Sequence, residues 1–536
     1  MTRLTALAMA ITSIMVFSHA VTAEESAAVS RCAALRRTDF STIMDAPTQV
    51  DDAKVITADA SSPAYCRVQG YIAPSVGFEL RLPLANWNGK FFEVGCGGFC
   101  GRPNEQSYCP LHRGYACILT DLGHHGVEGG QWAYNNLQAQ IDFGFRGAHV
   151  TALAGKAITE HYYGKAPAKS YFQGCSSGGQ QALSEAQRFP WDFDGILAGA
   201  PAPTMTWTIL FTWAKRALIG ADGKPLVTHA DMELLHSAAL ARCAVADGAK
   251  HGFIEDPRAC KFDPVELLCR TGKQNRCLSD AQVQAVRKLY AGPTNSRGER
   301  IYPGGPPPGS ELNWVDGEID TYVDTYVSDG KDKSPDDFSH NEWPEAYFSY
   351  MGFWPAPGPG WKFTDFDFDR DYKRMTITEP VMGAANNPDL RKFKAAGAKM
   401  ILYQGWADQS DIPADTIDYY ETTEKTMGGD AATQEFFRLF MVPGMFHCSG
   451  GAGAFAIDYL KYLEDWVERG KAPDKMIGAH VRGLNWLQAF QLKFPLDPAA
   501  PVDFTRPVYP YPLTVKYKGK GNPDDAVNFV SGPPPQ

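Results

Sequence analysis

The sequence predicts an α/β fold in which a mostly parallel sheet, flanked by helices, is interrupted by one large insertion. Short apolar segments alternate with helical patterns between about residues 90 and 200, an order typical of parallel sheets with helices on both faces. The same alternation returns at residue 399. Between them, residues 204–375 are rich in Pro, Gly, Trp and Tyr and include PGGPPPG at 303–309, which indicates an inserted domain with long loops.

The individual elements follow from apolar runs and helical spacing. Residues 24–90 mix short apolar runs with turn residues and indicate an antiparallel entry region. Strands are expected at 90–95, 114–121, 170–174, 193–199, 399–405 and 437–442. Helices are expected at 143–163, 180–188 and 455–468, and the tail after Pro495 is expected to be surface chain.

The N-terminus indicates export. Residues 1–23 combine Arg3, a largely apolar stretch at 4–17 and the small-residue cleavage site Val-Thr-Ala at 21–23, as a signal peptide does. The alternative, a membrane anchor, is disfavoured because the apolar stretch is short and interrupted by polar residues. A secreted or periplasmic protein with no membrane association after signal removal is therefore expected.

The composition argues against some classes of binding partner and against a zinc site. The 536 residues carry a formal net charge of −10, which argues against nucleic acid or an anionic membrane as main partner. Twelve cysteines in an exported chain favour disulfides. No CxxC pair with a matching second pair occurs, so a zinc site is not expected.

The segment Gly174-Cys175-Ser176-Ser177-Gly178 fits G-x-S-x-G and lies between an expected strand and an expected helix. In that context the motif is the nucleophile elbow of α/β-hydrolases, a sharp turn that lifts the serine hydroxyl above the sheet. Ser177 would then present its N–H to a developing oxyanion from the helix N-terminus. The alternative is an ordinary Gly-rich turn.

A serine nucleophile needs a base, and on this fold the chain order is Ser, acid, His. Asp408 follows the expected strand 399–405, and His447 follows 437–442. Asp411 and Asp415 compete with Asp408 for the acid, and the alternative for His447 is a surface-loop histidine.

Two cysteines adjoin these residues, since Cys175 precedes Ser176 and Cys448 follows His447. A disulfide between them would bring their Cα atoms within about 7 Å and so hold the two loops together. The alternative is two unrelated buried thiols.

At this point the sequence closely resembles the tannase and feruloyl esterase family, which carries a Cys-Ser … Asp … His-Cys signature. Here the signature reads Cys175-Ser176, Asp408 and His447-Cys448. Further matching stretches are VGCGGFCG at 94–101, TDLGHHG at 120–126, DFGFRGAH at 142–149, SYFQGCSSGG at 170–179, FDGILAGAP at 193–201 and GWAD at 405–408.

The resemblance implies an α/β-hydrolase catalytic domain formed by residues 24–203 and 376–536, with a lid at 204–375. It implies a triad of Ser176, Asp408 and His447, a bridge between Cys175 and Cys448, and an oxyanion hole from Ser177 with Gly98 or its neighbour Gly97. Disulfides Cys243–Cys260, Cys269–Cys277 and Cys32–Cys66 are expected. The pairing of Cys96, Cys100, Cys109 and Cys117 stays open, with Cys100–Cys109 and a buried thiol at Cys117 as the first choice.

Two departures from the family pattern bear on ligands. Family lids often bind calcium through C-D-x-x-D-G-x-x-D-G, whereas here Asp247 remains and Ala244 and His251 replace carboxylates. Calcium prefers several oxygen ligands, so the site is expected to be lost or weak, and no metal or cofactor is expected to be required. In the family, recognition of a terephthalate monoester uses a lid arginine that binds the free carboxylate. No arginine occurs between Arg300 and Arg370, which disfavours that substrate, and Lys331, Lys333 or Lys362 could substitute only loosely.

The aromatic residues at 343–354 could stack on an aromatic acyl group or form the core of the lid. The predicted function is hydrolysis of small-molecule esters of hydroxybenzoic or hydroxycinnamic acids through an acyl-enzyme. The alternatives are a broad carboxylesterase for small aryl or alkyl esters and a non-catalytic binding protein on the same scaffold. The sequence leaves the oligomeric state open.

Overall fold

The computed structural model describes residues 27–59, 62–103, 109–126, 129–272, 276–316, 327–328 and 343–534. The expected signal peptide, residues 1–23, lies outside the described residues. Among them, no helix is both long and apolar enough to cross a membrane.

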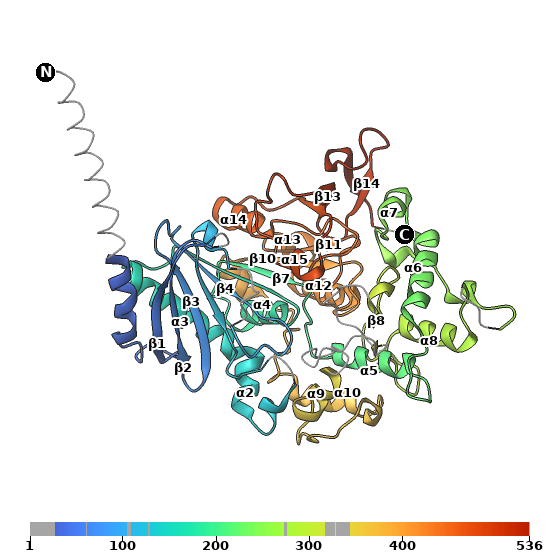
Figure 1. Ribbon diagram of the computed structural model, residues 1–536, viewed down its shortest axis with the longest axis horizontal. Helices are drawn as coiled ribbons and strands as arrows, with labels where there is room; N and C mark the ends of the chain where they lie inside the picture. Colours follow the sequence, from blue (N-terminus) through green and yellow to red (C-terminus); the bar gives the residue numbers. More distant parts are fainter. Residues whose placement is uncertain are drawn as a thin grey trace.

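One nine-stranded sheet forms the centre of the molecule (Figure 1). Its order is β1-β2-β3-β5-β4-β6-β7-β10-β11. The first four strands pair antiparallel, which agrees with the expected entry region, and the strands from β5 to β11 pair parallel. The strands are β1 Thr48–Ile56, β2 Tyr65–Ile72, β3 Val76–Pro83, β4 Lys90–Val94, β5 Ala116–Thr120, β6 Lys169–Cys175, β7 Gly195–Gly199, β10 Lys399–Gly405 and β11 Phe437–Val442.

The parallel strands are buried on both faces because their side chains alternate between two apolar cores. In β10, Met400 and Leu402 enter the larger core, while Ile401 and Tyr403 enter the second. Such strands appear in the sequence as continuous apolar runs, which is why the expected ranges for β10 and β11 match the structure residue for residue.

Helices cover both faces of the sheet. On one face, α3 (Gly147–Tyr163) packs on β5, and α4 (Ser177–Arg188) packs on β6 and β7. On the other face, α14 (Tyr459–Arg469) packs on β7 and β10. Further helices outside the insertion are α2 Leu137–Ile141, α11 Arg391–Ala395, α12 Pro413–Met427, α13 Asp430–Gln434 and α15 Trp486–Phe490, and residues 27–34 are helical as well. A π-helical turn, Asp142–Arg146, leads into α3.

Between β7 and β10 the described chain adds no strand to the main sheet. It forms helices that gather on one side of the molecule, away from β1–β3 (Figure 1). These are α5 Trp207–Leu218, α6 His229–Cys243, α7 Ala246–His251, α8 Asp280–Ala291, α9 Trp343–Tyr350 and α10 Asp371–Thr378, and the short pair β8 Val315–Asp316 and β9 Val327–Ser328 lies among them. The insertion is thus more helical than its Pro- and Gly-rich sequence indicates, and the nearly fully buried α5 contacts both α8 and α9.

The C-terminal segment is more structured than expected. The tail after Pro495, expected as surface chain, supplies three strands of two small antiparallel sheets, β12–β13 and β14–β15, and its Val508 and Phe504 are buried. The strands are β12 Met476–Val481, β13 Val502–Val508, β14 Thr514–Tyr517 and β15 Phe529–Gly532. The segment also meets β11, because Phe440 forms a bridge with Pro510 and the N–H of Tyr511 donates to the carbonyl of Leu439 at 2.8 Å.

Six disulfides use all twelve cysteines. Four agree with expectation: Cys32–Cys66, Cys175–Cys448, Cys243–Cys260 and Cys269–Cys277.

The expected Cys100–Cys109 bridge and the free Cys117 thiol are wrong. The turn after β4 brings Cys100 back to Cys96, with their Cα atoms 5.6 Å apart. A short 3-10 turn before β5 brings Cys109 to Cys117 at 5.9 Å. Both separations suit a disulfide, so local chain reversal decided the pairing.

Candidate active site

Ser176 occupies a strained turn between β6 and α4. Its backbone has φ 62° and ψ −127°, a region that non-glycine residues rarely adopt and that is characteristic of functional sites. A side chain at Gly174 would place its Cβ 2.2 Å from the carbonyl oxygen of Gly178, so the tight approach of strand and helix requires glycine there. The turn therefore has the geometry expected of a nucleophile elbow.

His447 is buried and lies between two carboxylates. Its Nδ1 is 2.9 Å from Oδ2 of Asp408, and its Nε2 is 3.8 Å from Oδ2 of Asp411. Because an ionised carboxylate only accepts hydrogen bonds, Nδ1 carries the proton and Nε2 is left as the base. This placement distinguishes the two candidate acids, since Asp408 faces the nitrogen that orients the ring.

Asp408 is held by several donors besides the histidine. The side chain of Gln404 donates to Oδ2 at 2.8 Å, and the backbone N–H groups of Ser410 and Asp411 donate to Oδ1 at 2.9 and 3.1 Å. These contacts fix the fully buried carboxylate in one orientation. The third candidate acid, Asp415, instead accepts a hydrogen bond from Tyr302 in the insertion, and burial raises its pKa to about 7.

The disulfide Cys175–Cys448 joins the serine turn to the histidine loop. Its Cα atoms are 5.9 Å apart although the cysteines are 273 residues apart in sequence. Ser176 and His447 are the direct chain neighbours of the bridged cysteines, so the bond limits how far the two loops can separate.

The loop after β4 lies beside the elbow. The side chain of Gln181 in α4 clamps Cys96, accepting from its N–H at 3.1 Å and donating to its carbonyl at 3.0 Å. Within the Cys96–Cys100 ring, Gly98 has φ +57°. Ser177 is the first residue of α4, so its N–H has no carbonyl partner within the helix. The two predicted oxyanion residues thus belong to segments that Gln181 connects.

Most of the aromatic stretch 343–354 belongs to the main core. Trp343, Tyr347, Phe348 and Phe353 are all buried in it, which favours the lid-core interpretation. Trp343 also lies against the loop after β4, because a Cβ on Gly98 would be 3.1 Å from its ring. One aromatic residue of the insertion therefore adjoins a predicted oxyanion residue.

Three supporting residues had no role assigned from the sequence: Gln181, Gln404 and Trp486, whose indole donates to the carbonyl of His447 at 2.6 Å. Gln181 and Gln404 had weak signals, since each lies four or five residues from a predicted catalytic residue. Trp486 had none, because only the three-dimensional fold brings it to the histidine loop.

The loop in which the sequence predicts a lost or weak calcium site makes contacts within the protein. The carboxylate of Glu255 accepts from the N–H groups of Val245 and Gly248, and His251 contacts Asp524 at 3.1 Å. The expected loss of calcium binding stays a prediction.

A cleft of about 770 Å³ lies between the insertion and α12. Tyr302, Tyr372 and Trp406 line it together with several prolines and the charged Asp418 and Glu421. Neither Ser176 nor His447 contributes to its lining.

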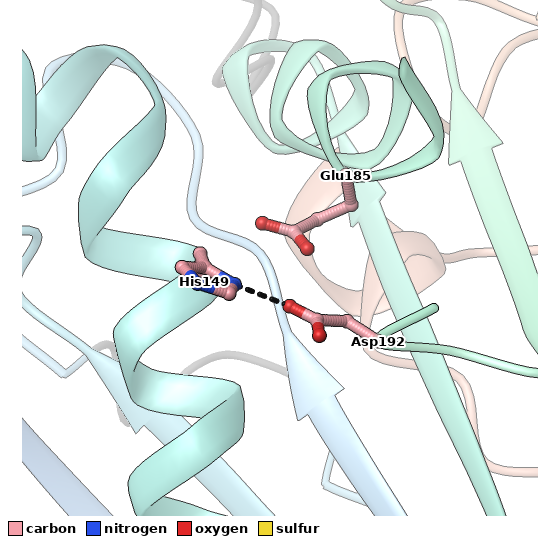
Figure 2. Close-up of side chains that lie close together, drawn as sticks. All are labelled: His149, Glu185 and Asp192. Atoms are coloured by element: carbon pink, nitrogen blue, oxygen red, sulfur yellow. Dashed lines mark hydrogen bonds and ion pairs between the residues drawn. The ribbon is translucent and has the colours of Figure 1, made fainter. Parts of the chain in front are cut away.

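A second polar cluster lies along α4, about nine residues or roughly 14 Å from Ser176. His149 of α3, Glu185 of α4 and Asp192 converge so that their ligand atoms lie within 4.8 Å of one another (Figure 2). Burial, followed by the charge of Asp192, raises the pKa of Glu185 well above its usual value. Lys156, which donates to the backbone carbonyl of Asp192, places a positive charge here.

The contacts of His149 and Lys156 disfavour a cation site. His149 Nδ1 is 2.5 Å from Asp192 Oδ2, so the imidazole is already engaged with the carboxylate. The Lys156 ammonium beside these groups would repel a metal ion.

Comparison with known proteins agrees with this architecture. Residues 54–531 match the family model described as tannase and feruloyl esterase. An uncharacterized esterase of Xanthomonas campestris pv. campestris is 34% identical, covering 95% of this chain and 92% of that protein. A mono(2-hydroxyethyl) terephthalate hydrolase of Piscinibacter sakaiensis is 33% identical, covering 92% and 89%. The crystal structure of feruloyl esterase B from Aspergillus oryzae has a TM-score of 0.78 at 26% identity, covering 94% of this chain and all of that one.

Fold and relatives together define a class: this is a carboxylic ester hydrolase with the α/β-hydrolase fold. Within that class, the chain belongs to the tannase and feruloyl esterase family.

Proposed function

We propose that the protein is an exported serine esterase that hydrolyses esters of aromatic carboxylic acids through an acyl-enzyme. The observation that carries the proposal is the placement of His447. Its Nδ1 contacts Asp408 at 2.9 Å, and the Cys175–Cys448 bond ties its loop to the strained turn of Ser176. The three residues together have the roles of a catalytic triad.

In the proposed reaction, Oγ of Ser176 attacks the ester carbonyl carbon while Nε2 of His447 takes the hydroxyl proton. Collapse of the tetrahedral intermediate breaks the bond to the alcohol, which leaves with the proton from Nε2. Water then attacks the acyl-enzyme with the same proton transfers and releases the acid. Asp408 orients the ring and stabilises the imidazolium throughout.

The oxyanion would be bound by the N–H groups of Ser177 and Gly98. The first begins α4, where the helix dipole favours negative charge. The second lies in the loop that Gln181 and the Cys96–Cys100 bond hold beside the elbow. Donors fixed in advance cost no reorganisation when the charge develops.

An aromatic acyl group is supported by two observations. The relatives include proteins named as a feruloyl esterase and a terephthalate monoester hydrolase. In this chain, the indole of Trp343 covers Gly98, so an aromatic surface adjoins the position where the ester carbonyl would bind.

Export is supported by the six disulfides, which persist in oxidising compartments, and by the signal-like N-terminal sequence. We further propose that residues 204–375 act as the lid over a catalytic domain formed by residues 24–203 and 376–536. The three triad side chains supply nucleophile, base and orienting acid, so the proposed reaction uses no cofactor, and its partner is the small ester itself.

The test is a substrate panel of methyl gallate, methyl ferulate, mono(2-hydroxyethyl) terephthalate and p-nitrophenyl butyrate. It is assayed with the wild type, Ser176→Ala and the neighbouring Ser184→Ala as control. Aromatic-ester cleavage that is lost only in Ser176→Ala supports the proposal. Full activity of Ser176→Ala contradicts the serine mechanism, and cleavage of the butyrate alone favours a broad carboxylesterase.

A further inference from the structure

The imidazole of His447 has a carboxylate near each of its two nitrogens. Of these two carboxylates, only that of Asp408 belongs to the proposed triad. Asp408 lies 2.9 Å from Nδ1, whereas Oδ2 of Asp411 lies 3.8 Å from Nε2. Asp411 is 4% exposed, so its charge lies in a largely water-excluded position. Nε2 is the nitrogen that must face the reacting ester, which places this second carboxylate at the substrate side of the histidine.

The backbone holds Asp411 in this position. Its N–H donates to Oδ1 of Asp408 at 3.1 Å, and its carbonyl accepts from the side chain of Gln404 at 2.7 Å. Two residues later, Pro413 begins α12, which fixes the end of the loop. Asp411 is therefore anchored to the same buried groups that anchor the triad acid.

A fixed negative charge beside the reacting atoms acts on any charge that the substrate brings. At a separation of about 8 Å and an effective dielectric constant of about 20, two unit charges interact strongly enough to change a rate constant by roughly tenfold or more. Repulsion disfavours an anionic acyl group, and attraction favours a cationic one.

We propose that Asp411 is a specificity-determining residue that selects against esters whose acyl group carries a negative charge. The proposal rests on the proposed function, because it concerns the charge of the acyl group at that active site. It is also consistent with the sequence of the insertion. No arginine that could bind a substrate carboxylate occurs between Arg300 and Arg370.

The experiment uses three para-substituted methyl benzoates that differ mainly in charge: monomethyl terephthalate (anionic), methyl 4-acetylbenzoate (neutral) and methyl 4-(aminomethyl)benzoate (cationic). Each is assayed with the full-length wild type, Asp411→Asn and Asp418→Asn. The last is the matched control, since it removes one carboxylate from the exposed side of α12. Ratios of kcat/KM between substrates are compared across variants, because such ratios cancel intrinsic ester reactivity and the fraction of folded enzyme.

We expect the wild type to prefer the cationic and neutral esters over the anionic one. Asp411→Asn should raise the anionic-to-neutral ratio about tenfold and lower the cationic-to-neutral ratio, while Asp418→Asn leaves both ratios unchanged. Asp411→Ser provides a second neutral variant if the asparagine side chain disturbs folding.

Equal changes on all three esters in both neutral variants would show a purely structural role and overturn the proposal. Unchanged ratios in Asp411→Asn would overturn it as well. Failure of the wild type to cleave any of the three would count instead against the proposed aromatic esterase function.

Discussion

Gln404 offers the sharpest test of how the proposed triad is supported. It is fully buried, donates to Asp408 and to the carbonyl of Asp411, and accepts from the hydroxyl of Thr416 at 3.0 Å. Replacing it by leucine keeps the volume and removes all three hydrogen bonds. A hydrogen bond to a charged group is worth about 1.5–3 kcal/mol, so losing the one to Asp408 should weaken the orientation of His447 by a comparable amount.

If the lost hydrogen bond stabilises the transition state but not the bound substrate, kcat should fall roughly 10- to 100-fold with little change in KM. The assay is steady-state hydrolysis of the best panel substrate, together with thermal unfolding of the same preparation. Gln187→Leu is the matched control, because Gln187 also donates to a backbone carbonyl and a hydroxyl, those of Ala385 and Tyr419.

The reasoning is refuted if Gln404→Leu lowers the unfolding temperature as Gln187→Leu does and yet keeps the wild-type kcat. That result would make Gln404 part of the buried scaffold with no influence on the histidine.

Two further predictions concern the tether and a buried acid. Replacing Cys175 and Cys448 together by serine should lower kcat at least tenfold and destabilise the fold by about 3–5 kcal/mol. Replacing Cys32 and Cys66 together should lower the stability and leave kcat unchanged. Equal kcat values in the two double variants would contradict a role of the Cys175–Cys448 disulfide in catalysis. Burial raises the pKa of Glu379 to about 7, so the folded state binds its proton more tightly than the unfolded state, and this group lowers stability as pH rises from about 4.5 to about 7. Glu379→Gln should therefore stabilise the protein by up to about 3 kcal/mol at about pH 8.5 and little at about pH 4. The free energy of unfolding is measured by urea denaturation, and an equal effect at both pH values would contradict the raised pKa of Glu379.

The sequence predicted the parallel strands well because each is buried on both faces. β10 and β11 are continuous apolar runs bounded by polar loops, and the loop after each strand supplied Asp408 and His447. Chain order on this fold then limited the candidates, and a distance was needed only to separate Asp408 from Asp411.

The parts that escaped prediction depend on contacts between distant segments. β14 has only four residues and carries a lysine, and β13 contains a proline, so neither shows a clear strand pattern. The observed disulfides Cys96–Cys100 and Cys109–Cys117 differ from the expected pairing because they depend on local turns. The spacing of the cysteines in the sequence does not reveal the geometry of these turns. The position of Asp411 beside Nε2 likewise arises from the fold of its loop.

The contact between the C-terminal segment and β11 has a consequence for solubility. β11 is the last strand of the main sheet, and an edge strand with free backbone groups can pair with another molecule. Pro510, which has no N–H to continue a ladder, and Tyr511 occupy part of that edge. Because β11 leads directly into the loop of His447, truncation before residue 510 should both expose this edge to pairing with another molecule and disturb the position of His447.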